Sequence, residues 1–141
     1  LEHMASDFLY NFISNHKFAV LSTVSDEHKP KSAVVGIAVT KDLKIFFDTV
    51  STSRKYQNLL KNPSVSFVIG WDNTQTIQYE GIARIPDESE LGELLEIYFN
   101  IFPDGRERYE TWNDIAYFIV DPKWIRYSDF SIPQTIEEIT L

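Results

Sequence analysis

The chain of 141 residues contains no cysteine. This absence excludes three kinds of chemistry at once, namely disulfide bonds, thiolate nucleophiles and cysteine-ligated metal sites. It does not identify a cellular compartment. Any functional site must therefore be built from other polar residues.

An excess of positive charge and long apolar runs are also missing. The 13 Lys and Arg residues are outnumbered by 21 Asp and Glu residues, which gives a net charge of −8. General nucleic-acid binding, which relies on basic residues, is therefore disfavoured, and an anionic ligand would need a local group of cations. No apolar run approaches the roughly 18 residues of a membrane helix, and no signal-peptide pattern is present, so we expect a soluble cytoplasmic protein.

Apolar residues are plentiful enough for one packed domain. Hydrophobic residues make up 43% of the chain and aromatic residues 14%. The length suits a single domain. Leu1 to Met4 resemble an expression scar, so we predict one domain over residues 5–141.

Hydrophobic periodicity predicts short strands with inserted helices. We expect a helix over residues 6–15 with Ser6 or Asp7 as its cap, a helix that starts at Arg54 and stops before Pro63, and an acidic helix over residues 86–100. The predicted strands cover residues 18–24, 32–40, 44–49, 64–71, 75–85, 116–120 and 124–127. About six antiparallel strands of this kind indicate a mainly β fold, a small closed or split barrel.

Some local patterns refine this expectation. Phe46 and Phe47 are neighbours and cannot face the same side of a sheet, so both faces of that strand should be covered. Gly81 inside a predicted strand indicates a bulge or a tight bend. Residues 103–105 form a predicted turn, residues 106–112 have no assignment, and the tail from Ser131 is polar and acidic.

The most informative stretch runs from Lys44 to Pro63, because it predicts a strand, a hydroxyl-rich turn and a helix that begins with two cations. The positive end of a helix dipole normally disfavours Arg and Lys in the first turn. Ser53, Arg54 and Lys55 would be favourable there if they bound a phosphate-sized anion together with free backbone N–H groups. A serine-capped helix with solvated cations is the alternative.

Acidic residues offer two other candidate sites. Glu88, Glu90, Glu93 and Glu96 could form a metal or acid–base cluster, although a charge run on a helix is usually a solvated face. Asp48 could act as a general base, or it could make a turn hydrogen bond at the end of its strand.

The order of these pieces resembles the pyridoxamine 5'-phosphate oxidase-like FMN-binding split-barrel family, and in particular its short general stress protein branch. The resemblance covers most of residues 18–130. It rests on segments 19–35, 44–67, 79–85 and 122–130, which include Phe-x-Thr, Ser-Arg-Lys and Asn-Pro-x-Val in sequence order. It implies a six-stranded antiparallel split β-barrel that binds FMN.

The resemblance also implies roles for individual residues. Ser53, Arg54 and Lys55 would hold the FMN phosphate, with Thr49 at the end of the preceding Phe-x-Thr strand. The backbone from Ser32 to Val35 would lie along the flavin ring, and a family glutamine falls on Gln75 or Thr76. The cofactor-binding residues predicted in this way are Ser32, Val34, Val35, Phe47, Asp48, Thr49, Ser53, Arg54, Lys55, Gln75, Thr76, Trp124 and Arg126.

Trp124 and Arg126 resemble a late Trp-x-Arg of the family that comes close to the flavin, while packing at the barrel end is the alternative for Trp124. The family forms twofold dimers with two flavins at the interface, which implies a homodimer here. True pyridoxamine phosphate oxidases carry basic residues where this chain has Ser32 and Ile37, and a late Arg-x-His where it has Arg126-Tyr127-Ser128. Vitamin B6 oxidation is therefore not expected.

The predicted function is that of a flavin-dependent oxidoreductase with a small-molecule redox partner, in which the flavin supplies the redox chemistry. No catalytic side chain is identified, and no metal ligand is assigned. A non-catalytic protein that stores or senses FMN is the alternative. Deazaflavin or haem could replace FMN, although neither His16 nor His28 is placed as a haem ligand.

Overall fold

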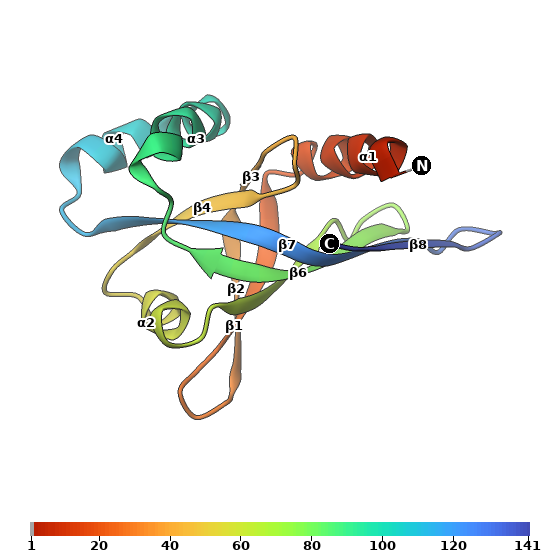
Figure 1. Ribbon diagram of the computed structural model, residues 1–141, viewed down its shortest axis with the longest axis horizontal. Helices are drawn as coiled ribbons and strands as arrows, with labels where there is room; N and C mark the ends of the chain where they lie inside the picture. The colour runs from red at the N-terminus through yellow and green to blue at the C-terminus, as the bar shows by residue number, and fades with distance from the viewer. Residues whose placement is uncertain (1) are drawn as a thin grey trace.

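The computed structural model describes residues 2–141, with side chains from Ala5 onward. This part of the chain forms four helices and eight strands (Figure 1). The helices are α1 (Glu2–Ser14), α2 (Arg54–Lys61), α3 (Glu88–Ile101) and α4 (Asp104–Thr111). The strands are β1 (Phe18–Val24), β2 (Pro30–Gly36), β3 (Ala38–Val39), β4 (Ile45–Val50), β5 (Ser64–Ile69), β6 (Gln75–Arg84), β7 (Ile115–Asp129) and β8 (Thr135–Thr140).

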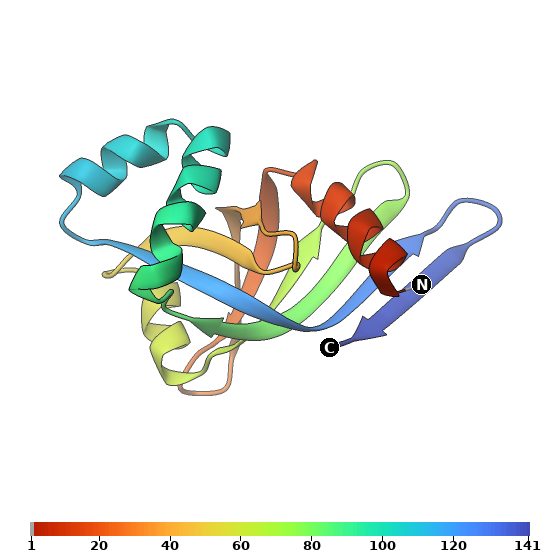
Figure 2. The ribbon, with the colours of Figure 1, turned by 45° about the horizontal axis from the view of Figure 1, so that its top comes forward.

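All strands belong to one curved antiparallel sheet with the order β2-β1-β5-β6-β7-β4-β3, and β8 pairs with β7. The long strand β7 joins the two halves, because it pairs with β4 through residues 115–120 and with β6 through residues 119–129. Figure 2 shows the sheet curling around an interior, with α1 beside β3. The predicted mainly β split barrel is confirmed, with eight strands instead of six.

Both faces of β4 are covered, as its adjacent phenylalanines predicted. Phe47 is fully buried in the barrel interior, where its ring lies 5.8 Å from that of Phe118. Phe46 faces the other side and packs against Tyr98 of α3 and Tyr117 of β7, each with a ring separation of 5.4 Å. A second, smaller core therefore lies between α3 and the outer face of β4 and β7.

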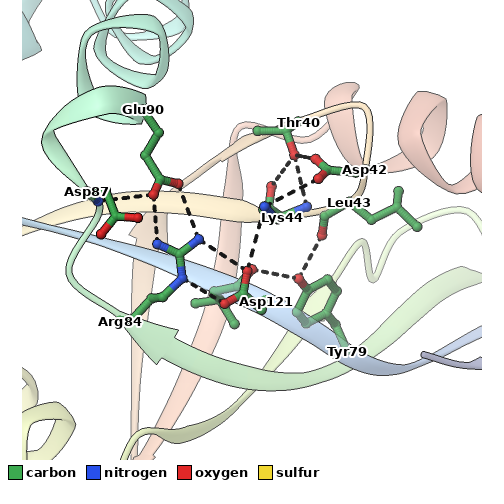
Figure 3. Close-up of polar contacts among 10 residues, drawn as sticks. Thr40, Asp42, Leu43, Lys44, Tyr79, Arg84, Asp87, Glu90 and Asp121 are labelled. Atoms are coloured by element: carbon green, nitrogen blue, oxygen red, sulfur yellow. Dashed lines mark hydrogen bonds and ion pairs between the residues drawn. The ribbon is translucent and has the colours of Figure 1, made fainter.

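Ionic contacts fasten α3 to the sheet beside this second core (Figure 3). Arg84 at the end of β6 pairs with Glu90 of α3 at 2.8 Å and with Asp121 of β7 at 2.8 Å. Glu88, Glu93 and Glu96 are exposed, which confirms a solvated face for most of the predicted acidic run. Glu90 is the member of the run that pairs with the sheet, and Glu96 pairs with Arg106 of α4 at 3.5 Å.

Two predictions in the N-terminal half were wrong. Helix α1 begins at Glu2, so Ser6 and Asp7 lie inside it and do not cap it. The strand predicted over residues 32–40 is divided into β2 and β3, because the chain leaves β1 after Gly36 to pair with β4. A side chain at Gly36 would collide with Phe102, since a Cβ there would lie 2.6 Å from the ring.

The split predicted between residues 116–120 and 124–127 was also wrong, because β7 is continuous. Pro122 cannot donate a ladder hydrogen bond, and it lies opposite Gly81, where the register of β6 shifts. The predicted bulge or tight bend at Gly81 is confirmed as a register shift, in which β7 carries one extra residue, Lys123, next to the proline. A Cβ on Gly81 would lie 2.5 Å from the Asp121 carbonyl oxygen, which explains the glycine.

The C-terminal region holds two elements that periodicity did not predict. The residues after Pro103 form α4 instead of a turn followed by unassigned chain. The polar tail contributes β8, in which Ile139 pairs with Ile125 and packs against the interior core. Within residues 2–141, no helix is long and apolar enough to cross a membrane.

Candidate functional site

The junction between β4 and α2 brings together the hydroxyls and cations that the sequence singled out. Ser53 is the N-cap of α2, and its Oγ accepts a hydrogen bond from the Tyr56 N–H at 3.1 Å. The Thr49 and Ser53 hydroxyls lie 2.9 Å apart, and Lys55 Nζ lies 3.5 Å from the Thr49 oxygen. The first turn of α2 has no acidic residue, so its N–H groups and cations have no counter-charge within that turn.

A pocket of about 140 Å³ opens at this junction. Its lining combines α2 with the β1–β2 hairpin, and it contains three cations. The residues that line it are Leu21, Thr23, Lys31, Ser32, Ala33, Ser53, Arg54 and Lys55. No carboxylate is found among these lining residues, so the pocket is a local concentration of positive charge on an acidic chain. We call it the phosphate pocket, after the anion that the sequence predicts for Ser53, Arg54 and Lys55.

Lys31 is a pocket residue that sequence reasoning missed. It is the second residue of β2 and lies opposite Thr23 of β1, and the hairpin carries both residues to the start of α2. The family resemblance aligns a basic residue of true pyridoxamine phosphate oxidases with Ser32, which is one residue after Lys31. A shift of one residue in that comparison could have identified Lys31, but the sequence does not show that the hairpin reaches α2.

A buried polar contact holds α2 against the hairpin. Asn58 is only 6% exposed, and its Nδ2 donates a hydrogen bond to Thr23 Oγ1 at 3.3 Å. Asn58 lies one turn after Arg54, so this contact fixes the helix next to the phosphate pocket. The periodicity of the helix indicated a buried face but did not identify Asn58 as part of it.

Strand β2 extends from the phosphate pocket along one end of the sheet. Ser32 lines the pocket, and its hydroxyl lies 2.9 Å from that of Ser22. Val35 is buried in the interior, whereas Val34 is 65% exposed on the outer face. Because β2 is the last strand in the sheet order, one edge of its backbone has no ladder partner among the described strands.

Three of the predicted cofactor residues, Phe47, Asp48 and Thr49, lie in β4 but outside the pocket lining. Phe47 is fully buried in the core, so it contributes to the site through packing. The Asp48 carboxylate faces α3 and α4, where it accepts hydrogen bonds from Tyr98 Oη at 3.1 Å and from Arg108 Nη2 at 3.0 Å. Asp48 therefore points away from the phosphate pocket, and its contacts are long-range ones, unlike the predicted turn hydrogen bond.

The remaining predicted residues form a separate group on β6 and β7. Gln75 donates a hydrogen bond to the Tyr127 hydroxyl at 2.9 Å, and Thr76 pairs with Ser128. The Arg126 guanidinium lies 5.4 Å from the Trp124 ring and pairs with Glu138 of β8. Within one chain, these residues do not line the phosphate pocket.

The outer face of the sheet carries an apolar row between these two groups. Val34, Val20 and Val68 are in register across β2, β1 and β5, and the same row continues to Gln78 and Arg126. Val34 is 65% and Val68 38% exposed. Contiguous apolar residues of this kind on a sheet face are typical of an interaction surface. We call these three residues the valine row.

Solved structures with the same fold include proteins of several descriptions. A haem-binding protein from Mycobacterium smegmatis matches this chain with a TM-score of 0.83 and 14% sequence identity. The match covers 96% of this chain, but this chain spans only 57% of that protein. General Stress Protein 26 from Bacillus anthracis has a TM-score of 0.73 at 22% identity, covering 97% of this chain and 98% of its own.

A pyridoxamine 5'-phosphate oxidase-related, FMN-binding protein from Nostoc punctiforme has a TM-score of 0.65 at 11% identity, covering 98% of this chain and 94% of its own. At these identities the structures show a shared fold. No curated protein sequence matches the chain. The family model described as pyridoxamine 5'-phosphate oxidase matches residues 6–129, and the chain therefore belongs to this family.

Proposed function

We propose that this protein binds FMN and acts as a flavin-dependent oxidoreductase, with the FMN phosphate in the phosphate pocket. The observation that carries the proposal is the convergence of Lys31, Arg54 and Lys55 on the N-terminus of α2. A phosphate dianion suits this donor set, because cations, hydroxyls and free N–H groups can all contact its oxygens. The redox chemistry would come from the flavin ring.

The position of β2 supports the same ligand. Ser32 lines the phosphate pocket, and the strand continues from there with a backbone edge that no described strand pairs. Free backbone N–H and C=O groups next to an anion pocket suit a ligand with a polar ring edge. In this arrangement Ser32 to Val35 would orient the flavin by backbone hydrogen bonds.

A homodimer would complete the site. Gln75, Thr76, Trp124 and Arg126 lie apart from the phosphate pocket in one chain, but the valine row lies between the two groups on an uncovered face. If a second copy covers this row, its own β6–β7 group can reach the flavin from the partner subunit. This arrangement agrees with the interface flavins that the family resemblance implies.

A non-catalytic flavin-binding protein is the second candidate. The residues lining the phosphate pocket include neither a carboxylate nor a histidine, so the described pocket offers no general acid or base of the usual kind. Steady oxidation of NADH or NADPH by the FMN-loaded protein with an added acceptor would support the oxidoreductase. Tight binding without turnover would support storage or sensing.

The decisive test is a fluorescence and absorption titration with FMN, riboflavin and haem. We expect tight FMN binding and much weaker riboflavin binding, because riboflavin lacks the phosphate. Arg54→Ala combined with Lys55→Ala should weaken FMN binding by at least about 100-fold, since each charge-assisted hydrogen bond is worth about 1.5 to 3 kcal/mol. Riboflavin binding should not change in this double variant.

Lys61→Ala is the matched control, because Lys61 lies in the last turn of α2 and pairs with Asp26 at 3.2 Å. This variant should bind FMN like the wild type. Equal FMN affinity in the double variant and the wild type would contradict the assigned phosphate pocket. Tight binding of haem with no binding of FMN would contradict the assigned cofactor.

A further inference from the structure

We propose that Arg108 of α4 is a positioning residue for the phosphate pocket and that it acts through Asp48 across β4. The inference rests on the proposed function, because that function supplies the ligand, FMN. The contacts that carry the inference lie outside the phosphate pocket. Figure 1 shows α3 and α4 on one side of β4 and β7, with α2 on the other side. Strand β4 is therefore the element through which the two sides can be coupled.

The first contact is the Asp48–Arg108 pair. Arg108 Nε and Nη2 donate to Asp48 Oδ2 at 3.1 and 3.0 Å, and Tyr98 Oη donates to Asp48 Oδ1 at 3.1 Å. The Asp48 side chain is only 15% exposed, and that of Arg108 is 20% exposed. Both oxygens of a largely buried carboxylate are thus held by α3 and α4. Asp104 also pairs with Arg108, at 2.7 Å, and fixes its orientation.

The second contact lies two residues after Thr49, whose side chain contacts the pocket residues Ser53 and Lys55. The Ser51 N–H donates to the Asp114 carbonyl oxygen at 2.8 Å, and Asp114 follows the C-terminal end of α4. Asp48 and Ser51 lie on either side of Thr49 in the sequence. Arg108 of α4 and the Asp114 carbonyl group, which lies between α4 and β7, therefore restrain the chain on either side of Thr49.

Thr49 transmits this restraint to the phosphate pocket. Its hydroxyl lies 2.9 Å from Ser53 Oγ and 3.5 Å from Lys55 Nζ, and its side chain is buried. If Arg108 is removed, the largely buried Asp48 carboxylate keeps the hydrogen bond from Tyr98 but loses its counter-charge and both donors to Oδ2, which is unfavourable. The end of β4 then shifts so that Asp48 can reach water, and Thr49 moves with it because the two residues are adjacent.

The test compares Arg108→Met, Arg108→Lys and the double variant Arg108→Met with Asp48→Asn. Two readouts are needed, namely amide hydrogen exchange over residues 49–56 in the ligand-free protein, and the affinities for FMN and riboflavin. Arg108→Met should accelerate exchange there and weaken FMN binding by about tenfold, a size typical of coupling through packed contacts. Riboflavin affinity should stay the same, because only the phosphate contacts are displaced.

The other variants sharpen the assignment. Arg108→Lys should lose less FMN affinity than Arg108→Met, because it keeps the positive charge beside Asp48. Adding Asp48→Asn to Arg108→Met should restore much of the FMN affinity, because the carboxylate without a counter-charge is then removed. Arg106→Met is the control, since Arg106 lies on the same helix, is exposed, and pairs with Glu96. It should leave both readouts unchanged.

The outcomes separate this inference from the proposed function. Unchanged exchange over residues 49–56 in Arg108→Met overturns the inference, and so does an equal loss of FMN and riboflavin binding. FMN binding that is tight and equal in all variants also overturns it while the proposed function stands. If the wild type binds no FMN but Arg108→Met accelerates exchange, the proposed function fails and the coupling between α4 and the pocket is supported.

Discussion

The hydroxyl groups of Tyr79 and Tyr117 are both buried, but their surroundings differ. Tyr79 Oη donates to the Leu43 carbonyl oxygen at 2.7 Å and lies 3.2 Å from that of Val120. Leu43 has a left-handed backbone with φ 68°, so this contact supports a strained turn (Figure 3). The Tyr117 hydroxyl is buried without a hydrogen-bond partner in the described chain, and burial, followed by the Asp48 charge, raises the pKa of Tyr117 to about 12.

These surroundings predict opposite outcomes for the same substitution. Tyr79→Phe should lower the free energy of unfolding by about 1 to 3 kcal/mol, because it leaves buried carbonyl groups without their donor. Tyr117→Phe should be neutral or slightly stabilising, because it removes a buried hydroxyl that has no partner. Urea denaturation of both variants measures the difference. An equal loss in both variants would contradict the assigned difference in hydrogen bonding between the two hydroxyl groups.

At this scale the sequence identified some residues of the pocket lining and missed others for a physical reason. Ser53, Arg54 and Lys55 were found because a cationic first turn is locally unfavourable, and that anomaly lies within three consecutive residues. Lys31 enters the phosphate pocket only through the hairpin register, and Asp48 turns to a partner in α4. Both facts depend on contacts between distant segments, which local patterns do not contain.

Helix α3 is held to the sheet by an ionic contact with a defined pH dependence. Hydrogen bonds from Arg84, followed by the Asp87 N–H, lower the pKa of Glu90 from 4.5 to about 2. Glu90 Oε2 accepts hydrogen bonds from Arg84 Nη1 at 2.8 Å and from the Asp87 N–H at 3.0 Å, and the second of these belongs to a capping box. The contact therefore joins the start of α3 to the end of β6.

Glu90→Gln should cost about 1 kcal/mol of stability at pH 7, a modest value because the ion pair is partly exposed. The folded-state pKa is depressed, so the stabilisation is complete above pH 4.5 and is lost as the pH falls towards 2. The stability difference between wild type and Glu90→Gln should shrink over this range. Glu93→Gln, an exposed site on the same helix, serves as the control. A difference that is constant with pH would contradict the ionic origin.

The elements themselves were predictable to the extent that they bury an apolar face. Strand β5 alternates Val65, Phe67 and Ile69 into the core, and its periodicity identified it correctly. Helix α4 has Gly105 as its only buried residue and so lacks a hydrophobic period. Strand β8 is exposed at most positions and depends on pairing with β7. Neither element could be recognised from an apolar pattern.

At the scale of the whole molecule, the valine row predicts the state of association. We expect a dimer in solution, and Val34→Glu combined with Val68→Glu should shift it to a monomer, because charge would be buried between the two copies. Light scattering coupled to size-exclusion chromatography measures the mass. FMN affinity should fall together with dimerisation, since the β6–β7 group would come from the partner subunit.

Ile132→Glu is the control for this pair, because Ile132 is 100% exposed in the loop between β7 and β8. It adds the same kind of charge at a site away from the valine row. A double variant that remains dimeric would place the interface elsewhere. A monomeric wild type would contradict the proposal that the β6–β7 group of a partner subunit reaches the flavin.

The central place of β7 in the sheet has a consequence for biosynthesis. Without β7, the sheet order separates into β2-β1-β5-β6 and β4-β3, because β7 is the strand between β6 and β4. A ribosome that has released only the residues before Ile115 therefore holds two sheet fragments with open edges. Such edges pair readily with other chains. Translation that stalls before β7 should yield nascent chains that aggregate or recruit chaperones, whereas release of residues 115–129 closes the sheet in one step.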